Sequence, residues 1–263
     1  MISFHFWLAL AIKMAVTAGF VVLATAVAER IGALAGALVA TLPIAAGPAY
    51  VFLALDHDAA FIAASALSTL AINAAIAIFS LTYAAAAQRR GLAVSLLAAL
   101  AVWTALAVIV QAVAWTLTSA VILNIAVIPA CAVIGRRFRD VPMPLVTRRW
   151  YDVPLRAAMA AVLVGIVVGS SGRVGASLTG ILAVFPIVLI SLMLILQPRI
   201  GGPATAAVLA NTISGLGGLF FSILTLHLAA VPLGSAAALA LALAVSVGAN
   251  FSIFVARRRG IPV

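Results

Sequence analysis

The feature that most constrains this chain is a series of apolar runs, each 17 to 29 residues long and separated by short polar segments. A helix needs about 20 predominantly apolar residues to cross the hydrocarbon core of a bilayer, whereas a membrane β-strand needs about ten residues of alternating polarity. Of the 263 residues, 67% are hydrophobic and only 8% are charged, which excludes a water-soluble domain. We therefore expect an all-α integral membrane protein whose main surroundings are the lipid bilayer.

The polar segments divide the chain into nine expected spans. The least clear division lies within residues 91–135, which hold 45 residues without a charge and are too long for one crossing. Trp115 and Thr116 offer an interfacial turn, so we divide the run there. No small-residue cleavage site follows the first run, which we expect to be a retained span. The spans are residues 4–28, 31–55, 59–87, 91–115, 118–135, 155–171, 174–197, 203–229 and 233–256.

The basic residues predict the orientation of these spans. A net charge of +10 would suggest a nucleic-acid partner in a soluble protein, but here the basic residues gather at the ends of apolar runs and indicate topology instead. With nine spans and the N-terminus outside, every basic loop except that of Arg173 lies on the cytoplasmic side. We expect a multi-pass protein of the bacterial cytoplasmic (inner) membrane, with a cytoplasmic C-terminus and no nucleic-acid partner. The cytoplasmic segments hold Arg30, Arg89, Arg90, residues 136–149, Arg199 and residues 257–259.

An internal repeat relates the two halves of the chain. A shift of 143 residues gives nine identities in the 32 pairs from 13/156 to 44/187, without a gap. Arg30 aligns with Arg173, and Pro43 aligns with Pro186. Self-similarity at a fixed offset is typical of a duplicated unit. We expect repeat 1 at residues 1–116, a connector helix and basic cytoplasmic loop at 117–143, and repeat 2 at 144–263.

The loops of the two repeats carry opposite kinds of charge. Arg89 and Arg90 align with uncharged residues 232–233, and the acidic loop at 56–58 aligns with residues 199–201, whose one charge is that of Arg199. An odd number of crossings between two copies turns the second copy upside down. The sequence therefore predicts two four-helix repeats of inverted topology.

Prolines interrupt the second span of each repeat near its expected midplane. Pro43, Gly47 and Pro48 fall within six residues, and each proline removes a backbone donor and crowds the carbonyl four residues earlier. We expect a full break here, whereas the single Pro186 leaves open whether span 7 breaks or only kinks. Paired interrupted helices are typical of a transporter's binding site, although a proline kink can also serve packing alone.

Two cations and two amides complete the expected solute site. Lys13 lies inside the first apolar run, where a charge is costly, and Arg156 is its repeat partner. Both side chains suit an anionic solute if they point into the bundle, but each could instead extend to the interface. Asn73 and Asn211 could line the cavity or form hydrogen bonds between helices. The predicted substrate-binding residues are Lys13, Pro43, Gly47, Pro48, Asn73, Arg156, Pro186 and Asn211.

The sequence contains no pattern typical of an enzyme. Its five acidic residues lie at span ends or in loops, and no two of its three histidines lie at ligand spacing on one helix. The glycine-rich segment at 169–173 lacks the flanking strand of a phosphate-binding loop. Cys131 is the only cysteine, which excludes an internal disulfide. We expect no catalytic residues, no metal and no cofactor.

Each half resembles the GlpM-like family of small bacterial inner-membrane proteins. The resemblance rests on an early cation followed 30 residues later by a proline, with a glycine between them. In the first half these are Lys13, Gly36 and Pro43, and in the second they are Arg156, Gly180 and Pro186. The second half departs from the pattern in having Arg for Lys and a single proline. The resemblance implies a duplicated four-span unit and leaves the substrate open.

Three functions are compatible with these features. The first is a transporter or permease that moves a small anionic solute by alternating access at the repeat interface. The second is a passive ion or solute channel at the same pseudo-twofold interface, and the third is a lipid-handling or assembly protein with no solute path. A homo-oligomer is compatible with each of them.

Overall fold

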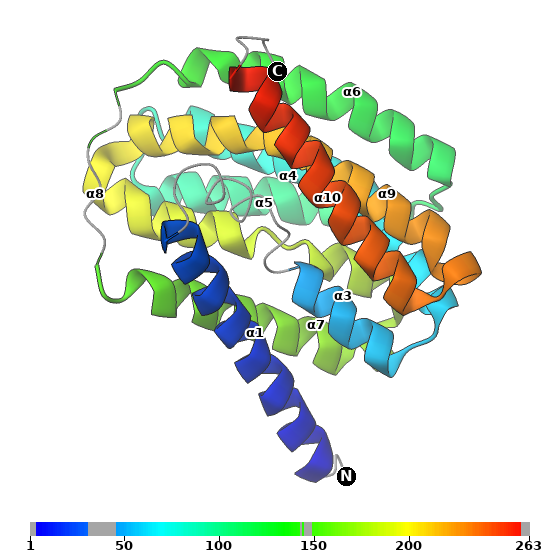
Figure 1. Ribbon diagram of the computed structural model, residues 1–263. Coiled ribbons are helices and arrows are strands. Elements are labelled where there is room, and N and C mark those ends of the chain that lie inside the picture. The colour runs from blue at the N-terminus through cyan, green and yellow to red at the C-terminus, as the bar shows by residue number, and fades with distance from the viewer. Residues whose placement is uncertain (1–3, 31–45, 143, 145–148, 259–263) are drawn as a thin grey trace.

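The computed structural model describes residues 4–30, 46–142, 144 and 149–258, and within these ranges every regular element is a helix. Pro43 lies outside the described residues. The first half contains α1 (Phe4–Arg30), α3 (Ala46–Asp56), α4 (Ala59–Ala86) and α5 (Leu92–Ala112), followed by α6 (Leu117–Gly135) and the short 3₁₀ helix η1 (Arg136–Phe138) (Figure 1). The second half contains α7 (Asp152–Ala183), α8 (Ile187–Thr212), η2 (Ile213–Gly215), α9 (Leu216–Leu233) and α10 (Ser235–Arg258).

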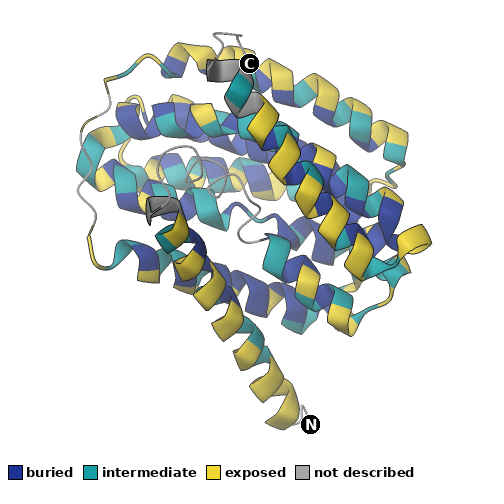
Figure 2. Ribbon diagram, viewed as in Figure 1, coloured by how far each residue is buried: buried dark blue, intermediate teal, exposed yellow. Residues whose placement is uncertain are grey.

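Helix α4 lies at the centre of the bundle. It packs against α5, α6, α7, α8 and α9, and its large side chains Phe79 and Tyr83 are fully buried. Figure 2 shows α4 mostly buried, whereas α1, α6 and α10 are exposed along one side. Exposed apolar side chains such as Ile12 and Ile122 would face lipid in a membrane.

Helix α1 is attached to the bundle mainly through α7. A methyl group on Gly165 would lie 2.7 Å from the sulfur of Met14, and one on Gly169 would lie 3.2 Å from Leu10. Two glycines four residues apart allow such a close approach of helices. The beginning of α1 extends beyond the other helices (Figure 1).

The predicted turn between spans 4 and 5 is confirmed. Helix α5 ends at Ala112 and α6 begins at Leu117. Thr116 caps α6 through its side chain, which accepts from the backbone N–H of Ser119, while the Ser119 hydroxyl accepts from the N–H of Thr116. This reciprocal capping satisfies two donors at the helix start.

Predicted span 7 is fully broken. Helix α7 ends at Ala183 and α8 begins at Ile187, so Pro186 precedes a new helix. Within α7, Gly175 has φ 76° and ψ 174°, a conformation open essentially to glycine alone. A short helical segment, residues 176–183, therefore lies between two interruptions.

A third interruption divides α8. Gly201 has φ 80° and ψ 169°, and the helix resumes at Gly202. A methyl group on Gly202 would lie only 2.0 Å from the carbonyl oxygen of Ala87, so the end of α4 packs directly on this backbone. From there the chain runs through η2 into α9, which together cover predicted span 8.

Seven helical stretches among the described residues are long and apolar enough to cross a membrane, which fits a membrane protein. The structure does not reproduce nine separate spans by this measure. The short apolar helix α3 is one reason, because only the second half of predicted span 2 lies within the described residues. The broken span 7 is the other, because its two parts belong to different stretches.

Candidate functional site: a charged cavity between α1, α3 and α7

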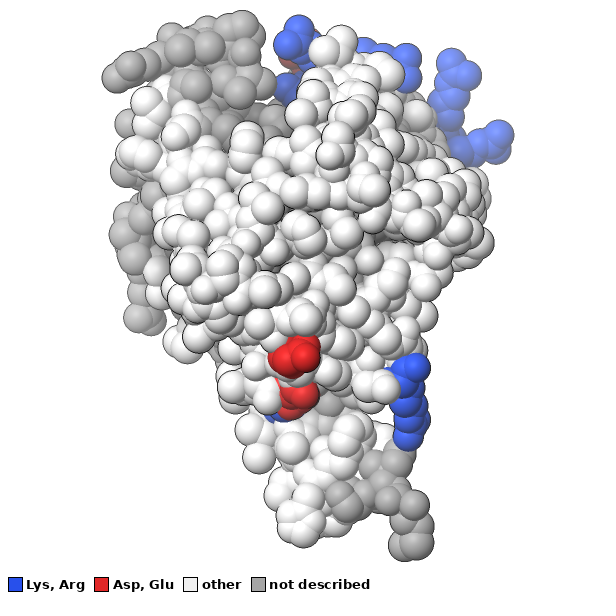
Figure 3. All heavy atoms as spheres, turned by 90° about the vertical axis from the view of Figure 1, so that its right-hand side faces the viewer, with Lys and Arg blue, Asp and Glu red and all other residues white. Residues whose placement is uncertain are grey.

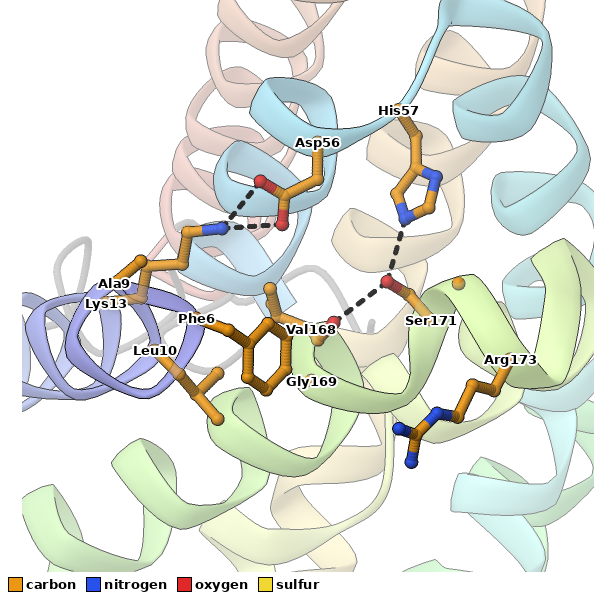
Figure 4. Close-up of a pocket in the computed structure, with 11 residues that line it drawn as sticks. Phe6, Ala9, Leu10, Lys13, Asp56, His57, Val168, Gly169, Ser171 and Arg173 are labelled. Carbon is orange, nitrogen blue, oxygen red and sulfur yellow. Dashed lines mark hydrogen bonds and ion pairs between the residues drawn. The ribbon is translucent and has the colours of Figure 1, made fainter. Parts of the chain in front are cut away.

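A cavity of about 520 Å³ lies between the first half of α1, the end of α3 and the middle of α7, just before its interruption at Gly175. We call it the α1/α7 cavity. Phe6, Leu10 and Val168 give it apolar walls (Figure 4). Its polar and charged lining consists of Lys13, Asp56, His57, Ser171 and Arg173.

Lys13 is held in this cavity by an ion pair with Asp56. The Lys13 Nζ lies 2.6 Å from Asp56 Oδ1 and 2.5 Å from Oδ2 (Figure 4). Asp56 is the last residue of α3, so the ion pair joins the first half of α1 to the end of α3. The Lys13 side chain is 17% exposed, so the carboxylate offsets much of the cost of placing a cation among apolar groups.

His57 links α3 to α7 through a short hydrogen-bond chain. The Ser171 hydroxyl donates its single proton to the carbonyl oxygen of Val168 at 2.9 Å, so it accepts from the His57 Nε2–H, 2.7 Å away. This assigns the proton of the neutral imidazole to Nε2. The His57 ring stacks on Phe61 with a centroid distance of 3.8 Å.

Arg173 brings a second cation to the cavity wall. Its side chain is exposed, and none of the described carboxylates forms an ion pair with it. Figure 3 shows most Lys and Arg side chains along the upper margin of the molecule, away from the small carboxylate cluster in its lower half. Arg173 lines this cavity together with Ser171 and His57.

A second, mostly apolar cavity of about 380 Å³ contains two of the predicted site residues. Gly47 and Pro48 of α3 line it together with residues of α1, α9 and α10. Its two polar side chains are already bonded, because the Tyr50 hydroxyl lies 2.6 Å from the Thr69 hydroxyl and Ser222 donates to the carbonyl oxygen of Ala242. This cavity offers no free charge to a solute.

The short segment 176–183, which precedes the break at Pro186, is held against α4 by hydroxyl groups of that helix. Thr69 donates to the carbonyl oxygen of Gly180 at 2.6 Å, and Ser65 donates to that of Ala176 at 3.0 Å. A broken helix in a membrane persists only where protein or water satisfies its free backbone groups. Pro186 itself is buried and lines neither of the two cavities.

The two predicted amides lie apart from both cavities. Asn73 donates to Asn124 Oδ1 at 2.9 Å and so joins α4 to α6. Asn211 donates to Ala207 of its own helix.

Arg156 is half-buried on α7, one turn after Asp152. The sequence predicts that Lys13, Pro43 and Pro186 border one cavity. Pro43 lies outside the described residues, and Lys13 and Pro186 share neither of the two cavities.

Sequence reasoning missed Asp56, His57, Ser171 and Arg173 as cavity residues. One signal pointed to Arg173, because it was the exception to the predicted charge distribution. The close approach of the acidic loop to Lys13 had no signal, because the two are 43 positions apart. Among the described residues, no group of three His, Cys, Asp or Glu could hold a metal ion.

The geometry defines a helical bundle of the membrane-protein class with a charged cavity near one end. Comparison of the chain with protein-family models, with curated proteins and with solved structures finds no match.

Proposed function

We propose that this protein is a transporter or permease that moves a small anionic solute across the cytoplasmic membrane by alternating access. The observation that carries the proposal is the α1/α7 cavity, which is lined by Lys13 of α1 and Arg173 of α7, the first helix of each predicted repeat. Asp56 neutralises one of the two charges, so Arg173 is the principal partner for a solute anion. The Nε2–H of His57 already donates to Ser171. The Arg173 guanidinium is then the group in the cavity that attracts an anion.

The proposed inverted repeat is supported by the helix boundaries. The 143-residue shift carries the start of α5 at Leu92 onto the start of α10 at Ser235. It also carries Ala59, the first residue of α4, onto Gly202, where α8 resumes after its interruption. Residues 46–56 of α3 fall on 189–199, within the part of α8 that precedes Gly201. Coincident boundaries are what two copies of one unit would give, and the GlpM-like resemblance would then apply to each copy.

The proposed orientation gives Arg173 a reason to lie on the outer side. The positive-inside bias disfavours an outer arginine unless it has a function there. Asp56, His57 and Arg173 then form an outer vestibule, and the loops with Arg89 and Arg136 face the cytoplasm. Solute would enter between α1 and α7 and proceed toward the interrupted helices.

Flux into proteoliposomes tests the proposal. A panel of radiolabelled carboxylates and inorganic anions should include at least one that the protein transports with saturation. Arg173→Gln should lower its uptake about tenfold, because a bond between two charged groups contributes about 1.5 to 3 kcal/mol. Arg89→Gln is the matched control, since Arg89 is an exposed arginine at the other end of α4, and it should leave uptake unchanged.

The same preparation separates the alternatives. Ion currents far above the turnover rates of carriers, measured under voltage clamp, would show that the protein is a channel rather than a transporter. Absence of saturable flux for every anion tested would overturn the proposed function and leave a lipid-handling role.

A further inference from the structure

A second ion pair lies at the end of the bundle opposite to the α1/α7 cavity. Arg199 of α8 donates to Asp152, the first residue of α7, through both of its terminal nitrogens, and one of these bonds measures 2.8 Å. The side chains are 11% and 13% exposed, less than those of Lys13 and Asp56 at 17% and 37%. Both pairs are within reach of water.

The two pairs occupy related positions in the proposed repeats. The 143-residue shift carries Asp56 onto Arg199, so one position is acidic in the first copy and basic in the second. Their partners lie on the first helix of each copy. The shift carries Lys13 onto Arg156, which is one helical turn from Asp152. In each copy an ion pair therefore joins the first helix to the segment that follows the proline. The first helix carries the cation in the first copy and the carboxylate in the second.

Helix α4 separates the two pairs along the bundle. Asp56 precedes the start of α4, whereas Gly202, three residues after Arg199, packs against Ala87 just beyond the end of α4. The 28 residues of α4 correspond to about 42 Å of helix. Two ion pairs at this separation cannot act on one another directly.

We propose that Lys13–Asp56 and Asp152–Arg199 are the outer and inner gates of this protein, which open in alternation. This inference rests on the transport function proposed above. An ion pair that is partly hydrated is a weak closure, because solvent replaces much of the attraction when it opens. Gly201 lies two residues after Arg199 in a conformation that serves as a helix interruption, so the inner pair can separate by rotation there without unfolding α8.

The surroundings of the inner pair support a closed state at that end. The Arg199 guanidinium lies over the ring of Tyr151, 5.3 Å from its centroid, and Arg149 donates to the Tyr151 hydroxyl at 2.9 Å. Hydrogen bonds from Arg149 and Arg199 lower the pKa of Tyr151. The outer pair borders a cavity of about 520 Å³, and the inner pair lines neither described cavity. Both ion pairs are formed in the structure, which thus corresponds to an occluded conformation with both gates closed and a cavity beside the outer one.

Labelling of a single cysteine tests the gates without a solute. Gly172 lines the outer cavity and has free space for a side chain, and Cys131 is the only native cysteine. Gly172→Cys in a Cys131→Ser background should react with a membrane-impermeant maleimide added from the outer side. Asp152→Asn should slow this reaction about fivefold, because loss of about 1 kcal/mol at the inner gate shifts the population toward the inward-facing state. Asp56→Asn should not slow it.

Two matched controls carry the same chemical change without an ion pair. Asp140→Asn lies near the basic end and Asp58→Asn lies two residues from Asp56, where asparagine still caps α4. Both should leave the rate unchanged. The exchange of Asp152→Arg with Arg199→Asp should restore the rate of the Gly172→Cys protein, which a folding defect could not do.

Equal labelling rates in all variants would contradict the proposal that the two ion pairs are gates. Slowing by Asp56→Asn as well as by Asp152→Asn would contradict it too. These outcomes leave the flux result intact. Conversely, an absence of saturable flux with opposite labelling responses would refute the transport function while retaining a two-state bundle.

Discussion

A methyl group on Gly180 would lie 2.0 Å from the carbonyl oxygen of Ser65, so the short segment 176–183 rests directly on the backbone of α4. The contact holds the broken part of span 7 in the bundle and allows Thr69 to reach the Gly180 carbonyl. A larger residue at this position would push the segment away from α4.

Gly180→Ala should therefore destabilise the protein. Overpacking at a rigid contact costs about 1 to 3 kcal/mol, because neither backbone can move far. The free energy of unfolding in mixed detergent micelles measures the effect. Gly172→Ala is the control, since a methyl group there meets nothing within 4 Å. Equal stability of the two variants would show that segment 176–183 is not closely packed.

Gly201 should be intolerant of substitution for a different reason. Its φ of 80° with ψ of 169° is strained for any side chain, although free space surrounds the site. Gly201→Ala should cost about 1 to 3 kcal/mol of unfolding free energy. Gly217→Ala, inside α9 and also in free space, should instead stabilise by about 0.5 to 1 kcal/mol, because alanine favours the helix. Thermal unfolding of both variants should show shifts of opposite sign.

The sequence predicts the helical class well because the length of an apolar run is a strong signal. It also places the turn at 113–116 correctly, since Trp115 and Thr116 supply polar groups and a cap where the run would otherwise be too long. The sequence alone does not decide whether span 7 breaks or only kinks, because a single proline can do either. The sequence analysis also did not single out Gly175, whose φ of 76° interrupts α7 a few residues earlier.

The partners of the polar residues could not be predicted. Lys13 and Asp56 are brought together by the paths of two helices, and Asn73 meets Asn124 only because α6 returns along α4. An apolar helix with little amphipathic pattern gives no indication of which side faces a neighbour. For this reason the sequence pointed to Lys13 as a cavity residue but not to the carboxylate that holds it.

Asn124 should contribute more to stability than the predicted site residue Asn211. Asn124 accepts from Asn73 and donates to the carbonyl oxygen of Leu70, so it joins α6 to α4 at two points. Asn124→Leu should lower the unfolding free energy by about 0.6 to 1.7 kcal/mol, the range for buried hydrogen bonds between membrane helices. Asn211→Leu removes only a bond within its own helix and should change stability by less than about 0.5 kcal/mol. The reverse order would contradict the packing of α6 on α4.

The Lys13–Asp56 pair predicts a measurable coupling between α1 and α3. Lys13→Gln and Asp56→Asn should each destabilise the bundle, and the double variant should lose less than the sum of the two, because each single variant already removes the same bond. A coupling of about 0.2 to 1 kcal/mol is expected for a pair that is partly exposed. A double-mutant cycle on the unfolding free energy in detergent provides the measurement.

The salt dependence of this cycle distinguishes the ion pair from simple packing. Screening weakens an attraction between exposed charges, so the coupling should shrink when the ionic strength rises from about 0.01 M to about 1 M. Lys13→Glu combined with Asp56→Lys should recover most of the coupling with the charges exchanged. A coupling that is unchanged by salt and absent from the exchanged pair would mean that Lys13 contributes to this end of the bundle through its hydrocarbon chain alone, and that Asp56 does not hold it.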